Sequence, residues 1–149
     1  MRTIAVRLRP GADLKGELVA LAARQRVPAG WVLTCVASLS QVRMQLAGGA
    51  EHATWQGPFE IIALTGTLSQ DGGHLHLVVA DHQGHTVGGH LAEGCTVRTT
   101  AEVVLGPTTC CCLPAGHKRL VAARAREPAG WIDRFSAGNS CGNSSSRCH

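Results

Sequence analysis

Aromatic residues are scarce in this 149-residue chain, which has two Phe, three Trp and no Tyr. The core of a single domain must therefore be built from aliphatic side chains, and few rings are present to stack nucleic-acid bases. No apolar run approaches the ~20 residues that span a membrane. The N-terminus alternates charged and apolar residues, without the apolar centre of a signal peptide. We therefore expect a cytoplasmic protein without membrane contact.

Several catalytic and disulfide patterns are also missing. The chain contains no P-loop, no Gly-X-Gly-X-X-Gly and no Ser-His-Asp order. Five of its seven cysteines lie from Cys110 onward, three of them consecutive. An odd count with this spacing matches neither a disulfide framework nor a Cys-X-X-Cys zinc site. Cys35 and Cys95 lie in apolar stretches, where a buried free thiol is expected.

Excess positive charge is absent from most of the chain. Residues 1–115 carry eight Lys and Arg against eight Asp and Glu, whereas residues 116–149 carry six against two and account for the net charge of +4. The first part is therefore not a basic nucleic-acid surface by charge. The segment 107–149 is rich in Cys, Ser and Arg, and its composition indicates a partly disordered tail.

The strand patterns are the clearest structural signal that the chain does contain. Alternating or continuous apolar residues predict seven strands, and helical spacing predicts one helix over about 13–26, with Asp13 as its N-cap. We expect an α+β domain over residues 1–106, a mostly antiparallel sheet of about seven strands with one main helix. The predicted strands cover residues 3–9, 31–38, 41–46, 59–68, 74–80, 85–91 and 96–105.

Three histidines on two neighbouring predicted strands form the main candidate site. His74 and His76 are two residues apart, and His90 follows Gly88-Gly89 on the next strand. Because strand side chains alternate, His-X-His places two imidazoles on one face. Imidazole is the commonest metal ligand, and three histidines with an open fourth position are typical of a catalytic zinc. The alternative interpretation is that these are partly exposed strand residues without a metal.

The turn between these strands decides whether His90 reaches the other two. If residues 82–84 form a three-residue loop with Gly84 in the left-handed conformation, Asp81 pairs with His85. Counting back along the two strands then places His76 opposite His90. A two-residue loop would instead turn His90 to the other face, unless a bulge at the preceding glycines restored the register.

The histidine motifs belong to a longer series of short motifs over residues 2–106. In order and spacing this series resembles the PPC domain, the plant and prokaryote conserved domain, which accompanies AT-hook DNA-binding proteins in plants and stands alone in bacteria and archaea. No Arg-Gly-Arg-Pro AT-hook core occurs here, so the resemblance is to the stand-alone type. The motifs are Arg9-Pro10-Gly11-Ala12-Asp13-Leu14, Ser38-Leu39-Ser40, residues 57–67, residues 71–77, Gly88-Gly89-His90-Leu91, Gly94-Cys95-Thr96-Val97 and residues 100–105.

The resemblance implies a compact α+β homotrimer with zinc, or another divalent metal, at His74, His76 and His90. The fold is also similar to that of acetolactate decarboxylase, which holds zinc with strand histidines. In plant relatives, a Gly-X-Phe-Glu-Ile segment is implicated in contacts with partner transcription factors. The matching residues here are Gly57, Phe59, Glu60, Ile61 and Ile62; alternatively, the apolar members are core or trimer interface.

Two functions follow as hypotheses. The first is a DNA-associated or regulatory binding module with a three-histidine metal site, whose partners are DNA, a regulatory protein or a small molecule at the metal. The alternative is a zinc-dependent enzyme, lyase, decarboxylase-like or hydrolase, acting on a small carbonyl or carboxylate compound with Glu60 or His85 as general base. A metal-storage role is a third. The family's usual last strand is not evident after residue 106, so the tail is either an extension or an altered reading frame.

Overall fold

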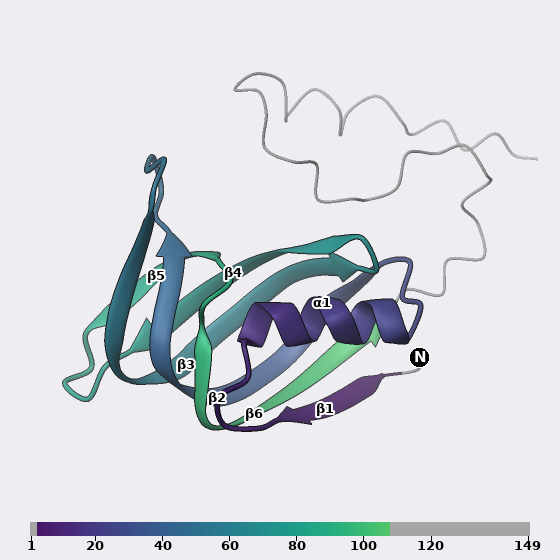
Figure 1. Cartoon of the computed structure of the whole chain (residues 1–149), viewed down its shortest axis with the longest axis horizontal. Coiled ribbons are helices and arrows are strands. Elements are labelled where there is room, and N and C mark those ends of the chain that lie inside the picture. The colour runs from purple at the N-terminus through teal and green to yellow at the C-terminus, as the bar shows by residue number, and fades with distance from the viewer. Residues whose placement is uncertain (1–2, 108–149) are drawn as a thin grey trace, which may run out of the picture.

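One curved antiparallel sheet and one helix make up the part of the chain that the structure describes, residues 3–107 of a computed structural model. Figure 1 shows the helix α1 lying across the sheet. The elements are β1 (Ile4–Leu8), α1 (Leu14–Arg24), β2 (Gly30–Gln45), β3 (His52–Ser69), β4 (Gly72–Ala80), β5 (Thr86–Leu91) and β6 (Thr96–Pro107).

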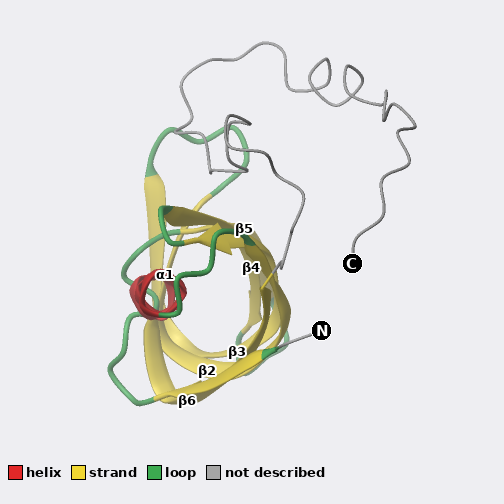
Figure 2. Ribbon diagram, turned by 90° about the vertical axis from the view of Figure 1, so that its right-hand side faces the viewer, coloured by secondary structure: helices red, strands yellow, loops and turns green. Residues whose placement is uncertain are grey.

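The sheet curls until it nearly closes on itself. Its strand order is β1-β6-β2-β3-β4-β5, with all pairs antiparallel, and β2 also pairs with β5. The near-closure depends on β2, which pairs with two strands along one edge. Its first part pairs with β6, and its last residues, Met44 and Gln45, pair with Leu91 and His90 of β5. Figure 2 shows the resulting open barrel with α1 at its open side.

The described residues contain six strands, so the expected number of seven was wrong. The segments 31–38 and 41–46, predicted as two strands, form the single strand β2 with a register shift at Ser40, between Leu39 and Gln41. A bulge inserts an unpaired residue and bends the strand without ending it. In the sequence, the extra residue interrupts the alternation of apolar and polar residues and so looks like the end of a strand. β3 is likewise longer than predicted, because it begins at His52 and runs through Pro58.

Helix α1 begins where the sequence predicts and ends slightly earlier. The Asp13 side chain accepts a hydrogen bond from the Gly16 backbone N–H at 2.7 Å, so Asp13 is the N-cap. The helix ends at Arg24, not at Arg26, because Arg26 has the left-handed φ of 51°. Its buried stripe consists of Leu14, Leu18, Leu21 and Ala22.

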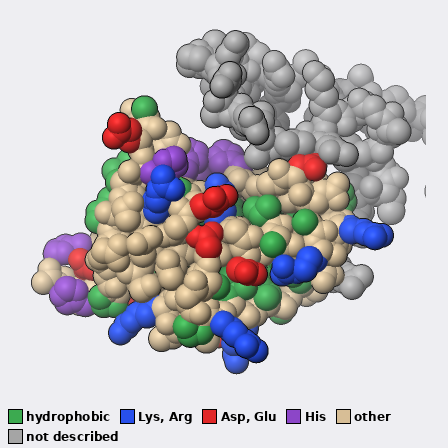
Figure 3. Space-filling model, in the orientation of Figure 1, with side chains coloured by type: hydrophobic (Ala, Val, Ile, Leu, Met, Phe, Trp, Pro, Cys, Tyr) green, Lys and Arg blue, Asp and Glu red, His purple; other side chains and the backbone are tan. Residues whose placement is uncertain are grey.

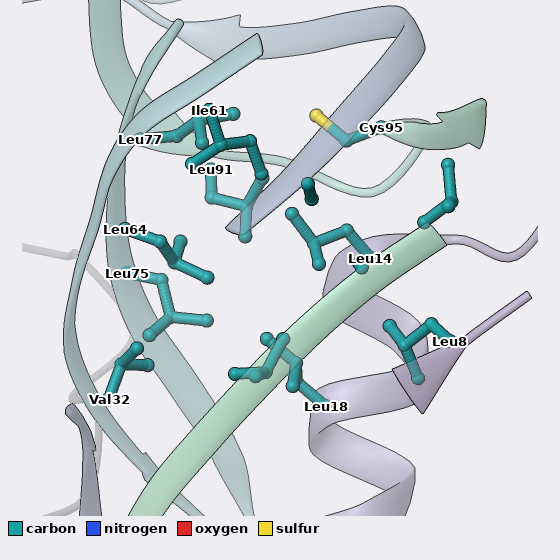
Figure 4. Packing of buried hydrophobic residues seen from close by; sticks show 14 of the residues in the cluster. Leu8, Leu14, Leu18, Val32, Ile61, Leu64, Leu75, Leu77, Leu91 and Cys95 are labelled. Carbon is teal, nitrogen blue, oxygen red and sulfur yellow. The ribbon is translucent and has the colours of Figure 1, made fainter. Parts of the chain in front are cut away.

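An aliphatic core fills the space between the helix and the inner face of the sheet. Leu14 and Leu18 of α1 point toward Leu75 and Leu64 of the sheet (Figure 4). All four side chains are almost fully buried, and each buried leucine contributes about 1.5–3 kcal/mol through the area it removes from water. The expected aliphatic composition of the core is confirmed, with Phe59 as its single buried aromatic ring among the described residues.

None of the helices in the described range has the length and hydropathy needed to cross a bilayer. The predicted tail at 107–149 lies, apart from Pro107, outside the described residues, as do the five cysteines from Cys110 onward. Of the two remaining thiols, Cys95 is buried and Cys35 is partly buried, and both are free.

Candidate metal centre

Burial of the intervening leucines aims the three candidate histidines outward. Leu75 and Leu77 are buried in the core, so the alternation of β4 places His74 and His76 together on its exposed face. Leu91 is buried at the end of β5 and turns His90 outward in the same way. The hydrophobic core therefore determines which face of the sheet carries the imidazoles.

The β4–β5 hairpin has a three-residue loop, the first of the two alternatives that the sequence left open. Gly84 adopts a left-handed φ of 85°, and the Asp81 N–H donates to the His85 carbonyl at 3.0 Å. The register that follows pairs His76 directly with His90. The Asp81 side chain fastens the loop by accepting from the backbone N–H groups of Gln83 and His85, at 2.8 and 2.9 Å.

The three imidazoles converge on one point of the surface. His74 Nε2 lies 3.2 Å from His90 Nδ1. The His76 ring centroid lies 4.4 Å from that of His90 and 5.2 Å from that of His74. One nitrogen from each ring can be chosen so that all three lie within 4.8 Å of one another. Figure 3 shows histidine side chains gathered in patches on the surface of the molecule.

This arrangement suits a divalent ion. Two nitrogens bound tetrahedrally to zinc at 2.0–2.1 Å lie about 3.4 Å apart, close to the 3.2 Å between His74 and His90. Within the part of the chain that the structure describes, no Asp, Glu or Cys joins the group. The residues present would therefore supply three neutral nitrogen ligands and leave a fourth position facing solvent.

The surroundings of His90 favour the neutral form of its imidazole, which is the form that binds a metal. Its pKa is lowered, first by partial desolvation and then by the neighbouring imidazoles of His76 and His74 and the ammonium of Lys15. A neutral imidazole has a free nitrogen lone pair, whereas imidazolium has none. His90 is thus disposed to bind a cation at pH values where an isolated histidine is already partly protonated.

Other predicted site residues lie elsewhere on the sheet. Glu60 pairs in register with Ser38 and lines a shallow depression with Thr99 and Glu102. It is five residues along β3 from Thr65, the cross-strand neighbour of His76, a separation of about 16 Å. His85 contacts Asp81 in the hairpin loop, with 3.3 Å between its Nδ1 and the carboxylate. Neither joins the three-histidine group.

The predicted partner-binding segment is divided between the two faces of the sheet. Phe59 and Ile61 are buried in the core, while Glu60 and Ile62 are exposed on the outer face. Gly57 lies beneath the Phe59 ring, so closely that a Cβ on Gly57 would overlap the ring. Within one chain, only Glu60 and Ile62 of this segment present large side chains to a partner.

Sequence reasoning did not identify the immediate neighbours of the histidines. On β3, Thr65 pairs with His76 and Thr67 pairs with His74, and both threonines are exposed on the same face. On the other side, Gln45 of β2 pairs with His90. The alternation of Thr65-Gly66-Thr67 was the available signal, because it repeats the period of His74-Leu75-His76 on the adjoining strand.

Comparison with known proteins places the chain in a family. A model of the Plants and Prokaryotes Conserved (PCC) domain matches residues 1–109. The chain belongs to the PCC family. This is the family that the motifs indicated, so that prediction is confirmed. The chain is also 51% identical over 105 residues to part of the bifunctional protein GlmU of Synechococcus sp. strain JA-3-3Ab, and this match covers 70% of this chain but only 17% of the relative.

Solved structures share the PCC fold. A hypothetical protein from Salmonella is 42% identical, with a TM-score of 0.70 over 71% of this chain and 77% of that one. The metal-containing protein AF0104 from Archaeoglobus fulgidus is 20% identical, with a TM-score of 0.61 over 72% and 79%. A protein from Bacteroides thetaiotaomicron named as a candidate DNA-binding protein is 19% identical, with a TM-score of 0.66 over 72% and 78%. The last two likenesses concern the fold alone.

Proposed function

We propose that this PCC protein is a binding module whose ligand is held at a divalent metal, with zinc the expected ion, bound by His74, His76 and His90. The observation that carries the proposal is the convergence of three imidazoles from two strands, with one nitrogen of each within 4.8 Å of the others. When bound, a divalent ion would act as a Lewis acid toward a small ligand. The metal-containing A. fulgidus neighbour, which shares the fold, agrees with this proposal.

Metal analysis of the purified protein tests the proposal. We expect about one equivalent of divalent metal per chain, and less than about a tenth of an equivalent in the His76→Ala variant. His85→Ala is the matched control, because His85 is an exposed histidine of the hairpin connection and lies outside the group. Equal metal content in His76→Ala and wild type, or a lack of metal in wild type after incubation with zinc, would refute the centre.

The length of the Synechococcus relatives supports a domain that acts together with other protein domains. There the related region makes up 17% and 16% of proteins named GlmU, so it is attached to a much longer sequence. A domain that is joined to other proteins in some relatives suits a regulatory or accessory role. A regulatory protein is therefore a proposed partner for this chain.

Direct binding of DNA is a second candidate, suggested by the name of the B. thetaiotaomicron neighbour. The charge of the domain gives it little support, because residues 3–107 contain seven Lys and Arg against eight Asp and Glu. Filter binding of duplex DNA at low salt can be measured for residues 1–109 and for the whole chain. The comparison separates DNA binding by the domain from DNA binding by the basic segment that follows it. Retention by residues 1–109 would establish the domain itself as the DNA-binding element, and its absence would remove DNA as a ligand of the domain.

An enzymatic role on a small carbonyl or carboxylate compound is favoured by the open fourth position of the centre. Glu60 and His85 are too distant within one chain to act as its general base, so a base would have to come from elsewhere. Turnover of 2-keto and 2-hydroxy acids by the metal-loaded protein, with His76→Ala as the control, tests this role. Turnover that survives the substitution would assign the activity to something other than the centre.

A further inference from the structure

The three-histidine centre offers only neutral ligands. An imidazole carries no charge when it binds a metal, so a divalent ion at His74, His76 and His90 would retain its full charge of about +2. Structural zinc sites often offset this charge with thiolates, but no Cys, Asp or Glu of the described residues joins this group. An uncompensated cation at an exposed surface attracts an anion as its next ligand.

Two hydroxyl groups border the place where such a ligand would bind. Thr65 and Thr67 lie directly across from His76 and His74 on the neighbouring strand, and all four side chains are exposed on one face. Directly opposite residues have Cβ atoms about 4.5–5.5 Å apart. A ligand of a few atoms bound to the metal would therefore lie within hydrogen-bonding reach of a threonine hydroxyl, which can donate to an anionic oxygen.

A cationic residue, Lys15, lies on an element that is tied by hydrogen bonds to the segment following the strand of His90. Lys15 occupies the first turn of α1, which two hydrogen bonds tie to the segment after β5: Gly94 N–H to the Asp13 carboxylate at 2.5 Å, and Leu14 N–H to the Cys95 carbonyl at 2.9 Å. That segment begins just after His90 and Leu91.

We infer that Thr65, Thr67 and Lys15 form an anion subsite beside the metal, and that the ligand of this centre is a small oxyanion with a carboxylate or phosphate group. The inference rests on the proposed metal centre and adds the chemical class of its ligand. One anionic oxygen would bind the metal, a second would accept from a threonine hydroxyl, and the ammonium of Lys15 would add to the attraction for the anion. The arrangement disfavours cationic ligands and neutral ligands without an oxygen acceptor.

Cobalt substitution provides a direct readout. Cobalt(II) bound in place of zinc has visible absorption that changes when its fourth ligand changes, so acetate, oxalate and inorganic phosphate can each be titrated into the cobalt-loaded protein. We expect a saturable spectral change with at least one of these anions. Thr65→Val and Thr67→Val keep side-chain size and remove the hydroxyl, and Lys15→Met removes the charge. We expect Lys15→Met to bind the anion about tenfold more weakly than wild type does. At least one of the two threonine variants should show a loss of anion affinity of the same size.

Two matched controls sit outside the subsite. Thr86→Val removes an exposed hydroxyl four residues along β5 from His90, about 13 Å away. Arg24→Met removes an exposed cation from the opposite end of α1. Both should bind the anion as wild type does. Which anion binds most tightly then distinguishes a carboxylate ligand from a phosphate ligand.

The outcomes separate the inference from the proposal on which it rests. Full cobalt binding in wild type and in all five variants, with no anion effect or with equal anion affinities, overturns the subsite and leaves the metal centre intact. Absence of cobalt binding in wild type overturns the metal centre and the subsite together. Loss of cobalt from Thr65→Val or Thr67→Val alone would make those threonines supports of the histidines and would contradict a role in ligand binding.

Discussion

Gly66 passes so close to the carbonyl oxygen of His74 that a Cβ on this residue would overlap it. Gly66 also has φ of 132°, a conformation that residues with a side chain rarely adopt. Both constraints act where β3 and β4 pair through Thr65, Thr67 and the first two histidines of the candidate centre. The backbone position of His74 therefore depends on the absence of a side chain on the neighbouring strand.

Replacing Gly66 with alanine should displace β4 at His74 and weaken the metal centre. We expect Gly66→Ala to lower the free energy of unfolding by about 2 kcal/mol or more and to reduce zinc affinity at least about tenfold. Denaturant unfolding and zinc titration measure the two effects. Gly48→Ala is the control, because Gly48 has a left-handed φ of 73° with nothing within 4 Å of the added Cβ. Gly48→Ala should lower the free energy of unfolding but leave the zinc affinity unchanged. Equal loss of zinc affinity in both variants would contradict the role of Gly66.

The hairpin loop offers a second test, because it sets the register that pairs His76 with His90. Asp81→Ala removes the acceptor of two loop hydrogen bonds and should lower both the melting temperature and the metal affinity. Asp81→Asn keeps a side-chain oxygen in the same place and should retain most of both. Thermal unfolding and metal titration of the two variants make the comparison. Equal metal affinity in Asp81→Ala and wild type would show that the core alone maintains the register.

Cys95 should make the fold sensitive to alkaline pH. Burial raises the pKa of its thiol to about 11, from an ordinary value near 9, and its Sγ–H donates to the Arg43 carbonyl at 3.2 Å. The unfolded thiol therefore ionises first as pH rises, so the stability it contributes is complete below pH 9 and is lost between about pH 9 and 11.

The measurement is the free energy of unfolding at several pH values for wild type and Cys95→Ala. We expect wild type to lose up to about 2 kcal/mol more than the variant across this range. The comparison is favourable because the chain has no Tyr, which would otherwise titrate in the same range. Parallel curves for the two proteins would show that the Cys95 thiol does not contribute to the pH dependence.

The sequence predicted the elements that depend on local chemistry. The Asp13 cap and the alternation around His74 and His76 each involve residues close together in the chain, and both were found in the structure. The loop at Gly84 was one of two alternatives that the sequence left open, and the structure has the three-residue form. The single strand β2 was mistaken for two because a bulge interrupts alternation as a turn does. The position of Lys15 was not predictable, because it depends on how α1 packs against the segment that follows β5.

The outer face of the sheet carries apolar residues that a lone chain would leave in water. Val36 on β2 is 65% exposed and Ile62 on β3 is 60% exposed, with Leu33 at 45%. These residues belong to neighbouring strands of the same sheet. Covering such a surface with another copy of the chain would bury apolar area, which contributes about 25 cal/mol per Å². We therefore propose that this face is a subunit contact of the homotrimer that the family resemblance implies.

A single charge on this face should therefore prevent assembly without unfolding the chain. We expect wild type to have three times the mass of one chain by light scattering, and Ile62→Lys to have the mass of one chain at the same concentration. The cost arises because a buried ammonium without a partner is unfavourable by several kcal/mol. Thr54→Lys, on an exposed position of the same strand, should remain a trimer. Because the exposed side chain of Ile62 adds little to the core, circular dichroism of Ile62→Lys should match wild type; a trimeric Ile62→Lys would place the subunit contact on another face of the sheet.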